Sequence, residues 1–304
     1  MPRTERMPKP EHPLMPVLAA LLAIGLLSWM DAWMKNAALA IGAFSTVFLR
    51  APISVALVAP LWAAKERRWP PPRVMRIHVA RGLVIAAMGF LFFYSLTLLP
   101  LAQAIAISFV APLIALYLAS LLLGEQIGKR AIVGSLLGFA GVLVIIGGKV
   151  FRETLTPGAG IGIAAVLASA VFYAFNLMLA RKQAQVAGPF EVALFQNLVC
   201  LVAYAVFLPW FLQWPESAAT WRDIGISAVL SVCGAMLFAW AYARAETQRL
   251  APVEYSGFLW AALFGWIHFG EAVTGATVAG AALIVAGCWI ATRGAPPAPE
   301  QAVA

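Results

Sequence analysis

Asp31, Arg50, Glu254 and His268 are ionisable side chains inside long apolar stretches of the sequence, and Arg81 lies near the end of another. Stretches of about 20 apolar residues are long enough to span a bilayer, and ionisable residues inside them are rare and usually functional. Asp31 and Arg50 flank the expected turn between the first two stretches, so they can share a depth. Because two uncompensated charges there would be costly, we expect them to form a charge pair or gate. Glu254 and His268 lie nearer to segment ends, where packing at the interface is the simpler interpretation.

Aromatic side chains are the second group suited to bind a solute. Six lie inside apolar stretches, and two polar residues accompany them: Trp29, Tyr94, Tyr173, Trp240, Tyr255 and Trp260, with Ser108 and Asn176. A mostly apolar pocket with a few oriented hydrogen-bonding groups is the usual form of a small-molecule site, and a ring face attracts an amine. The alternative is packing toward lipid or in an interfacial belt, where Trp62 and Trp210 fit well. We expect the eight residues to bind substrate.

The composition places these residues in a membrane protein. Of 304 residues, 62% are hydrophobic and 11% charged, and the mean hydropathy of +0.87 is far above that of a soluble domain. Ten apolar stretches are expected to span the bilayer as helices: residues 14–34, 41–63, 79–98, 101–123, 131–148, 160–180, 190–212, 224–243, 251–269 and 273–292. The sequence therefore predicts an all-α, polytopic membrane protein.

The net charge of +8 is explained by orientation in the membrane. With a cytoplasmic N-terminus, the expected inside segments hold 15 Lys and Arg residues, and the outside segments hold only Lys35, Lys149, Arg152 and Arg222. This bias follows the positive-inside rule and predicts that both termini are cytoplasmic. No nucleic-acid partner is implied. The expected location is a plasma membrane, such as the bacterial inner membrane.

The two halves of the chain end alike. At an offset of 146 residues, Gly124, Glu125 and Gly141 correspond to Gly270, Glu271 and Gly287. Each half holds five expected helices, and because five is odd, the second copy enters the membrane from the opposite side. Two inverted repeats around a central site are the architecture of alternating-access transporters, although some channels share it.

The repeat divides the chain into five parts. We expect a disordered cytoplasmic tail over 1–13, a five-helix repeat over 14–148, a linker loop over 149–159, a second repeat over 160–293 and a second disordered tail over 294–304. Glu125 and Glu271 are expected to complement helix N-terminal dipoles in turns rather than to contact substrate. Gly134 and Gly138 form a small-xxx-small pair, which predicts that the last helix of the repeat packs closely on another.

These features resemble the drug/metabolite transporter superfamily in its EamA-type ten-helix form. The resemblance rests on APLIALYLASLLLGE at 111–125, FLWAALFGWIHFGE at 258–271 and VFLRAPISVAL at 47–57, and it extends over residues 14–293. It implies two inverted five-helix repeats, helices that surround a central path, and transport of small metabolites, often export of amino acids.

Other functions fit the sequence less well. Motifs of hydrolases, nucleotide-binding loops and metalloproteases are absent, so no enzyme is expected. Cys200, Cys233 and Cys288 lack ligand-like spacing, and neither a metal nor a cofactor is expected. A nucleotide-sugar or sugar-phosphate carrier needs cations in its path, and only Arg50 lies deep in a helix. A channel-like pore also stays open as an alternative. The sequence favours export of small neutral or zwitterionic metabolites, amino acids including aromatic ones, by a monomer or homodimer in the lipid bilayer.

Overall fold

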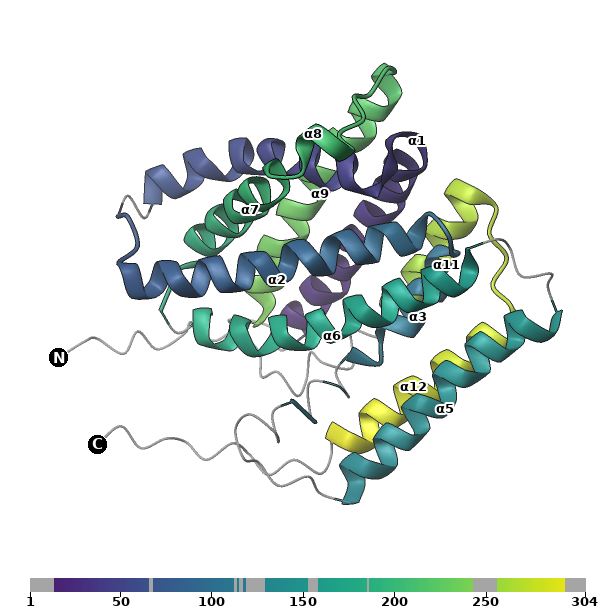
Figure 1. Ribbon diagram of the computed structural model, residues 1–304. Helices are drawn as coiled ribbons and strands as arrows, with labels where there is room; N and C mark the ends of the chain where they lie inside the picture. The colour runs from purple at the N-terminus through teal and green to yellow at the C-terminus, as the bar shows by residue number, and fades with distance from the viewer. Residues whose placement is uncertain are drawn as a thin grey trace, which may run out of the picture.

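The structure is a computed structural model that describes residues 14–65, 68–111, 114, 117–118, 129–152, 158–184, 186–242 and 256–292. Within these ranges the chain is helical and contains no strand (Figure 1). The prediction of an all-α polytopic protein is confirmed. Both expected tails, the Glu125 turn, Glu254 and Tyr255 lie outside the described residues.

The first two expected helices form one element with a bend. Helix α1 (Met15–Lys65) has 51 residues, and at a rise of 1.5 Å per residue its axis would measure about 75 Å if it were straight. A bilayer core is only about 30 Å thick, so the helix must turn back. It does so at Gly42, whose φ of 77° and ψ of 155° are open to glycine but strained for other residues. The expected polar turn after residue 34 is therefore wrong, because residues 35–40 are helical.

Nine further helices follow in the described ranges. They are α2 (Pro72–Leu96), α3 (Leu101–Ser108), α5 (Lys129–Arg152), α6 (Ala159–Ala184), α7 (Pro189–Ala205), α8 (Leu208–Phe211), α9 (Ala218–Tyr242), α11 (Gly257–Phe269) and α12 (Gly275–Thr292). Proline opens the first turn of α2 and of α7, where its missing N–H costs nothing. Gly270 ends α11 in the left-handed conformation, with φ of 64°.

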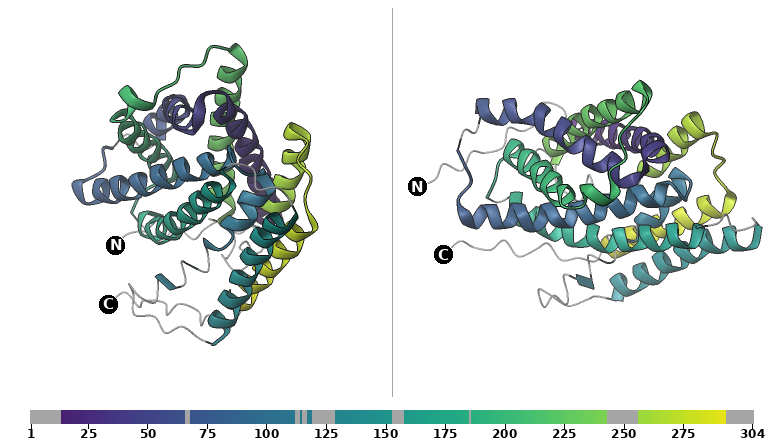
Figure 2. Two further views of the ribbon diagram at one scale, coloured as in Figure 1. Left: turned by 45° about the vertical axis from the view of Figure 1, so that its right-hand side comes forward. Right: turned by 45° about the horizontal axis from the view of Figure 1, so that its top comes forward.

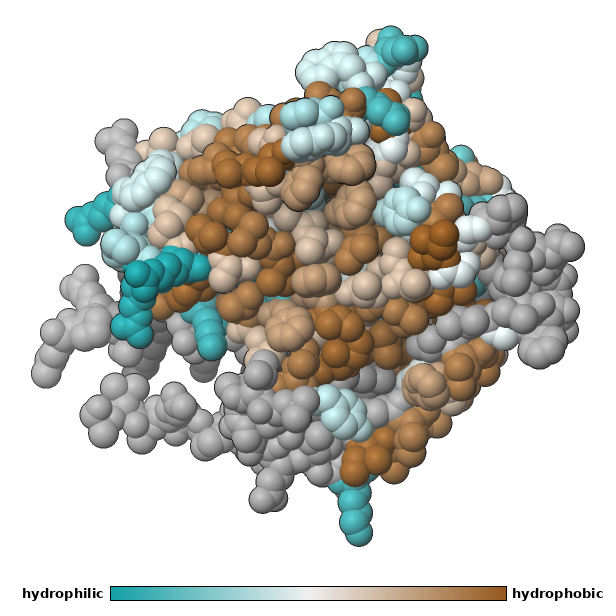
Figure 3. All heavy atoms as spheres, viewed as in Figure 1, coloured by the Kyte–Doolittle hydropathy of each residue, from teal (hydrophilic) through white to brown (hydrophobic). Residues whose placement is uncertain are grey.

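The lengths of the helices fit a bilayer. Met15–Lys65, Pro72–Leu96, Ala159–Ala180 and Ala218–Phe238 are long and apolar enough to cross it. Shorter apolar helices cover Ile132–Ile145, Pro189–Ala205, Gly257–Phe269 and Gly275–Gly287. Apolar residues cover the middle of the face in Figure 3, and hydrophilic residues gather toward its edges.

The helices define two ends of the bundle. The kink end holds Gly42, residues 97–100, 206–217 and 270–274, and the tail end holds Lys65, the start of α2 and residues 186–188. The first arm of α1 runs toward the kink end, whereas α6, its counterpart in the second half, starts there and runs back (Figure 1). The opposite directions agree with inverted repeats.

Packing joins the two halves throughout. The most extensive contacts are those of α1 with α9, α5 with α12 and α2 with α6, followed by those of α1 and α2 with α7. Figure 2 shows α5 and α12 side by side at one flank. A Cβ added to Gly141 would lie 2.5 Å from the Gly280 carbonyl oxygen, so the α5 and α12 backbones touch through glycine. The expected close packing of the last helix in the repeat is confirmed. The main core is built around Leu96, Leu101 and Ile107, at the α2–α3 junction and in α3.

Candidate substrate path between the two repeats

Rings from α1 and α11 stack on one another where the repeats meet. Trp260, Phe264 and His268 are four residues apart on α11 and so share a face. Trp29 of α1 stacks on Phe264 with centroids 5.8 Å apart at 11°, and Trp260 stacks on the same ring at 5.9 Å and 14°. Trp33 meets His268 edge to face at 5.2 Å. We call these five residues the aromatic ladder.

Glycine on α1 makes room for the aromatic ladder. A Cβ added to Gly25 would lie 3.1 Å from the Trp260 ring, a contact tighter than ordinary packing. Trp29 is 37% exposed, so the ladder is not wholly enclosed by protein.

A chain of hydrogen bonds joins α2, α6 and α7. Arg81 Nε donates to Asn176 Oδ1 at 2.9 Å, and Arg81 Nη1 donates to Gln183 Oε1. Gln183 Nε2 meets His78 Nδ1 at 2.5 Å, and His78 Nε2 meets Glu191 Oε1 at 2.9 Å. Asn176, Gln183 and His78 are buried. We call these five residues the polar chain.

Asp31 and Arg50, the expected charge pair, lie within electrostatic reach of each other but make no direct ion pair. Arg50 Nη1 donates instead to Ser231 Oγ of α9 at 2.9 Å, and Arg50 Nε is buried without a partner. Cys200 and Tyr204 of α7 also interact electrostatically with Arg50. The guanidinium thus keeps hydrogen-bonding capacity for an anionic group.

A buried ion pair at the kink end ties the two halves together. Lys35 of α1 pairs with Glu271, and its Nζ also donates to the Leu99 carbonyl at 2.9 Å. The second oxygen of Glu271 accepts from the Leu101 N–H at 2.7 Å. The Lys35 ammonium lies 4.8 Å from the centre of the Phe269 ring. The expectation that Lys35 lies in an outside loop is wrong, because its side chain is only 6% exposed.

The sequence gives a weak signal for this ion pair. A lysine at the end of an apolar stretch is most simply assigned to the adjoining loop. Glu271 was expected to act on a helix dipole, whereas the structure joins it to a cation 236 positions away. One signal is present in the sequence: Lys35 is the one cation between the first two expected helices.

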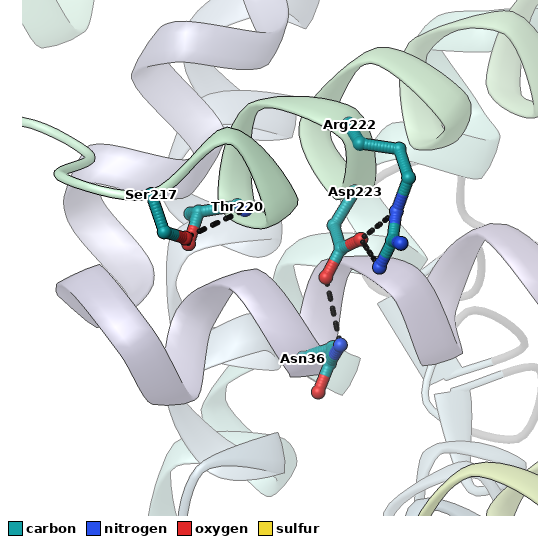
Figure 4. A network of polar contacts seen from close by, with 5 residues as sticks. All are labelled: Asn36, Ser217, Thr220, Arg222 and Asp223. Atoms are coloured by element: carbon teal, nitrogen blue, oxygen red, sulfur yellow. Dashed lines mark hydrogen bonds and ion pairs between the residues drawn. The ribbon is translucent and has the colours of Figure 1, made fainter.

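A second polar group lies close by at the start of α9 (Figure 4). Asn36 Nδ2 donates to Asp223 Oδ2 at 2.7 Å, and Arg222 donates twice to Asp223 Oδ1. Arg222 also lies over the Trp33 ring, 5.4 Å from its centre. Ser217 accepts from the Thr220 N–H at 3.1 Å and so caps the helix. These contacts fix the aromatic ladder to α9.

A small cavity borders the Lys35–Glu271 pair. Its volume is about 50 Å³, and its lining includes Pro100, Gln103, Gly265, Glu271 and Thr277. Gln103 Oε1 is buried there without a hydrogen-bond partner. A space of this size fits water rather than an amino acid.

The remaining residues expected in the site are scattered. Tyr94 stacks on Phe90 at 6.1 Å and is 36% exposed. Trp240 packs beside Ala20 and Ala241 in a separate cluster. Ser108 Oγ donates to the Ile105 carbonyl of its own helix. Tyr173 is half-buried on α6 and interacts electrostatically with Arg81. Of the expected residues, the structure joins Trp29 to Trp260 through Phe264, and it brings Asn176 to Arg81.

The EamA-like transporter family matches residues 14–147 and again residues 160–293. The chain belongs to this family. It is therefore a multi-pass membrane transporter, and its substrate is a small molecule.

Relatives within the EamA-like group move different solutes. The pseudopaline exporter of Pseudomonas aeruginosa is 28% identical over 287 residues, which cover 91% of this chain and 95% of that protein. The aromatic amino acid exporter of Ancylobacter novellus is 26% identical, with 74% and 76% covered. The S-adenosylmethionine uptake transporter of Rickettsia prowazekii is 26% identical, with 69% of each chain covered. A solved crystal structure matches with a TM-score of 0.63 and 24% identity over 91% of this chain and 96% of that chain, which supports the fold.

Proposed function

We propose that this EamA-like protein is an alternating-access exporter of small neutral or zwitterionic metabolites, most of all amino acids with aromatic side chains. It has no catalytic activity of its own in this proposal. In this proposal the tail end faces the cytoplasm, because the positive-inside bias favours that orientation in an inner membrane. The kink end then faces outward.

The observation that carries the proposal is the aromatic ladder. Its rings come from α1 in the first repeat and α11 in the second, so relative movement of the repeats opens and closes the stack. Ring faces attract both apolar side chains and amines. A site at the junction of two repeats is what alternating access requires.

Two charged groups on α1 suit the carboxylate and the amine of an amino acid. Arg50 keeps an unpartnered buried Nε for a carboxylate, and Asp31 on the same helix as Trp29 can accept from an amine. Because the two are close but not paired, a zwitterion can bind both without first breaking an ion pair.

Two relatives that are exporters support export, and one of them supports aromatic amino acids as the solute. The two exporters described above carry pseudopaline and aromatic amino acids, whereas the Rickettsia relative is an uptake transporter. Direction therefore has to be measured for this protein itself.

The test is transport in proteoliposomes with a panel of the 20 amino acids and one nucleotide sugar, with and without a proton gradient. We expect the wild-type protein to export aromatic amino acids. Trp260→Ala should slow this efflux at least fivefold, with normal yield and melting temperature. A matched control is Trp210→Ala, because Trp210 is 72% exposed on the short helix α8. Transport of the nucleotide sugar alone would refute the proposal.

A further inference from the structure

Each hydrogen bond of the polar chain can run in only one direction from donor to acceptor. An arginine can only donate, so the Gln183 atom facing Arg81 must be the amide oxygen. The Gln183 nitrogen then faces His78 Nδ1 and donates to it, which leaves Nδ1 without a proton. His78 Nε2 therefore carries the hydrogen and donates to Glu191. The geometry fixes His78 as a neutral imidazole in this conformation.

A proton on His78 conflicts with this order. Protonated histidine donates from both nitrogens, so Nδ1–H would face the Gln183 N–H group. Turning the Gln183 amide by about 180° removes the conflict, because its oxygen then accepts from His78. The same turn presents an N–H group to Arg81, which loses an acceptor. An outside carboxylate can replace that acceptor, and charge-assisted hydrogen bonds to arginine are the strong kind.

The charges around the polar chain favour both the protonation of His78 and the release of Arg81 from Gln183. Glu191 already contacts His78 and becomes its ion-pair partner once the imidazole is charged. Arg81 has two neutral partners, Asn176 and Gln183, and no acidic partner in the described part of the chain. The other titratable or charged groups near the polar chain are Arg50 and Lys65 of α1, Arg76 of α2, Tyr173 and Lys182 of α6, and Cys200 and Tyr204 of α7. Among these, no second carboxylate is available to Arg81.

The position of Arg81 connects it with the path. Arg81 and Arg50 both interact electrostatically with Cys200, whose Sγ contacts the Gly82 carbonyl at 3.5 Å. Arg81 also interacts electrostatically with Tyr173 of α6. Arg50 and Arg81 thus both lie near Cys200, and in this inference a solute held by its amino-acid end at Arg50 offers a second carboxylate to Arg81.

We propose that Arg81 is a second carboxylate-binding group in the substrate path, and that its release from Gln183 is linked to the uptake of one proton by His78. Amino acids with a second carboxylate then form a further class of substrates, beside the neutral and zwitterionic ones. This inference rests on the proposed function in one respect, namely that Arg81 faces the transported solute. It differs from the proposed function in the substrate class and in the proton link.

The test uses two probes of the same shape. 4-Carboxy-L-phenylalanine carries the second carboxylate, and 4-carbamoyl-L-phenylalanine has a neutral amide in its place. Binding is measured by isothermal titration calorimetry in phosphatidylcholine nanodiscs between pH 6 and 8, in two buffers with different ionisation enthalpies. These nanodiscs contain no anionic lipid that could occupy Arg81. The comparison of buffers reports the protons taken up.

For the carboxylate probe, Kd falls as the pH is lowered, by up to tenfold per pH unit, with uptake of up to one proton. The carbamoyl probe shows less than a twofold change. In His78→Gln the pH dependence of the carboxylate probe is lost. In Gln183→Leu, which frees Arg81 permanently, the carboxylate probe binds more tightly at pH 8 and its Kd no longer depends on pH.

The matched control is Lys182→Gln, which removes an exposed cation next to Gln183 and keeps the wild-type pH dependence. An unchanged pH dependence in His78→Gln overturns the link, and so does equal behaviour of the two probes or no binding of the carboxylate probe. If His78→Gln does not fold, Gln183→Leu decides alone. Failure of all amino-acid transport in proteoliposomes, with the proton-linked binding intact, would reject the proposed function and leave this inference standing.

Discussion

Burial makes a charge costly unless its partner and its remaining hydrogen bonds are in place. Lys35 and Glu271 meet this condition, because the ammonium also donates to the Leu99 carbonyl and the carboxylate also accepts from the Leu101 N–H. The pair therefore holds the α2–α3 junction between α1 and the turn after α11. Loss of this ion pair should therefore lower the free energy of unfolding.

Replacing Lys35 by Met should destabilise the protein by about 3–5 kcal/mol, because Glu271, whose side chain is only 17% exposed, would lose its cation. For a chain of this size that is a fall of about 5–8 °C in melting temperature, measured in detergent. Lys182→Gln is the control, because Lys182 is exposed and an exposed charge contributes at most about 1 kcal/mol. Equal shifts in the two variants would show that burial of the Lys35 pair adds nothing.

The Asp31 and Arg50 charges should be coupled more weakly than the Lys35 and Glu271 charges. Arg50 donates a hydrogen bond to Ser231, and it interacts with Asp31 electrostatically without a direct contact. In a double-mutant cycle of Asp31→Asn and Arg50→Met, we expect a coupling energy of about 1 kcal/mol, measured from unfolding midpoints. A coupling as large as that of the Lys35 pair would mean that the two charges meet directly in another conformation. Transport by the folded double mutant should be lost, because both ends of the amino acid lose their partner.

Among the helices, α5 and α12 depend most on backbone contact. A Cβ at Gly141 would also lie 2.6 Å from Ile284, and the Gly280 carbonyl cannot move aside without shifting its helix. Gly141→Ala should therefore lower stability by about 1–3 kcal/mol, read from the unfolding midpoint in detergent. Gly147→Ala on the same helix has nothing within 4 Å of the added Cβ and should be neutral or stabilising by up to about 1 kcal/mol. A stable Gly141→Ala protein would contradict the close contact.

The sequence predicts the helices better than it predicts their connections. Long apolar runs and the glycines of α5 are local signals, because length and spacing alone determine whether a helix can span or pack closely. The Lys35–Glu271 pair is not a local signal, because its residues are 236 positions apart in the sequence. The bend at Gly42 is set by the φ angle of one residue, which a hydropathy pattern does not report. Of the expected site residues, Trp29 and Trp260 share the Phe264 ring, whereas Tyr94 and Trp240 lie elsewhere, since a hydropathy pattern does not say which face of a helix meets which neighbour.

At the scale of the whole molecule, the orientation in the membrane can be measured directly. In a protein with all three native cysteines replaced by alanine, a cysteine at Arg68 or Lys129 should react with a membrane-impermeant maleimide only from the cytoplasmic side. A cysteine at Glu216, exposed at the kink end, should react only from outside. The basis is the excess of Lys and Arg at the tail end. Outside labelling of position 68 in intact cells would reverse the proposed orientation.

The bend at Gly42 decides where a reporter can be fused to the protein. Surface loops accept inserted peptides because their backbone is not part of a helix, but the two arms of α1 are joined by a single glycine with helical residues on either side. A tag inserted there would have to unwind α1 and separate Lys35 from Glu271. Residues 212–216, between α8 and α9, are irregular and mostly exposed. At the kink end, residues 212–216 are therefore a better place than the bend for an epitope or a fluorophore.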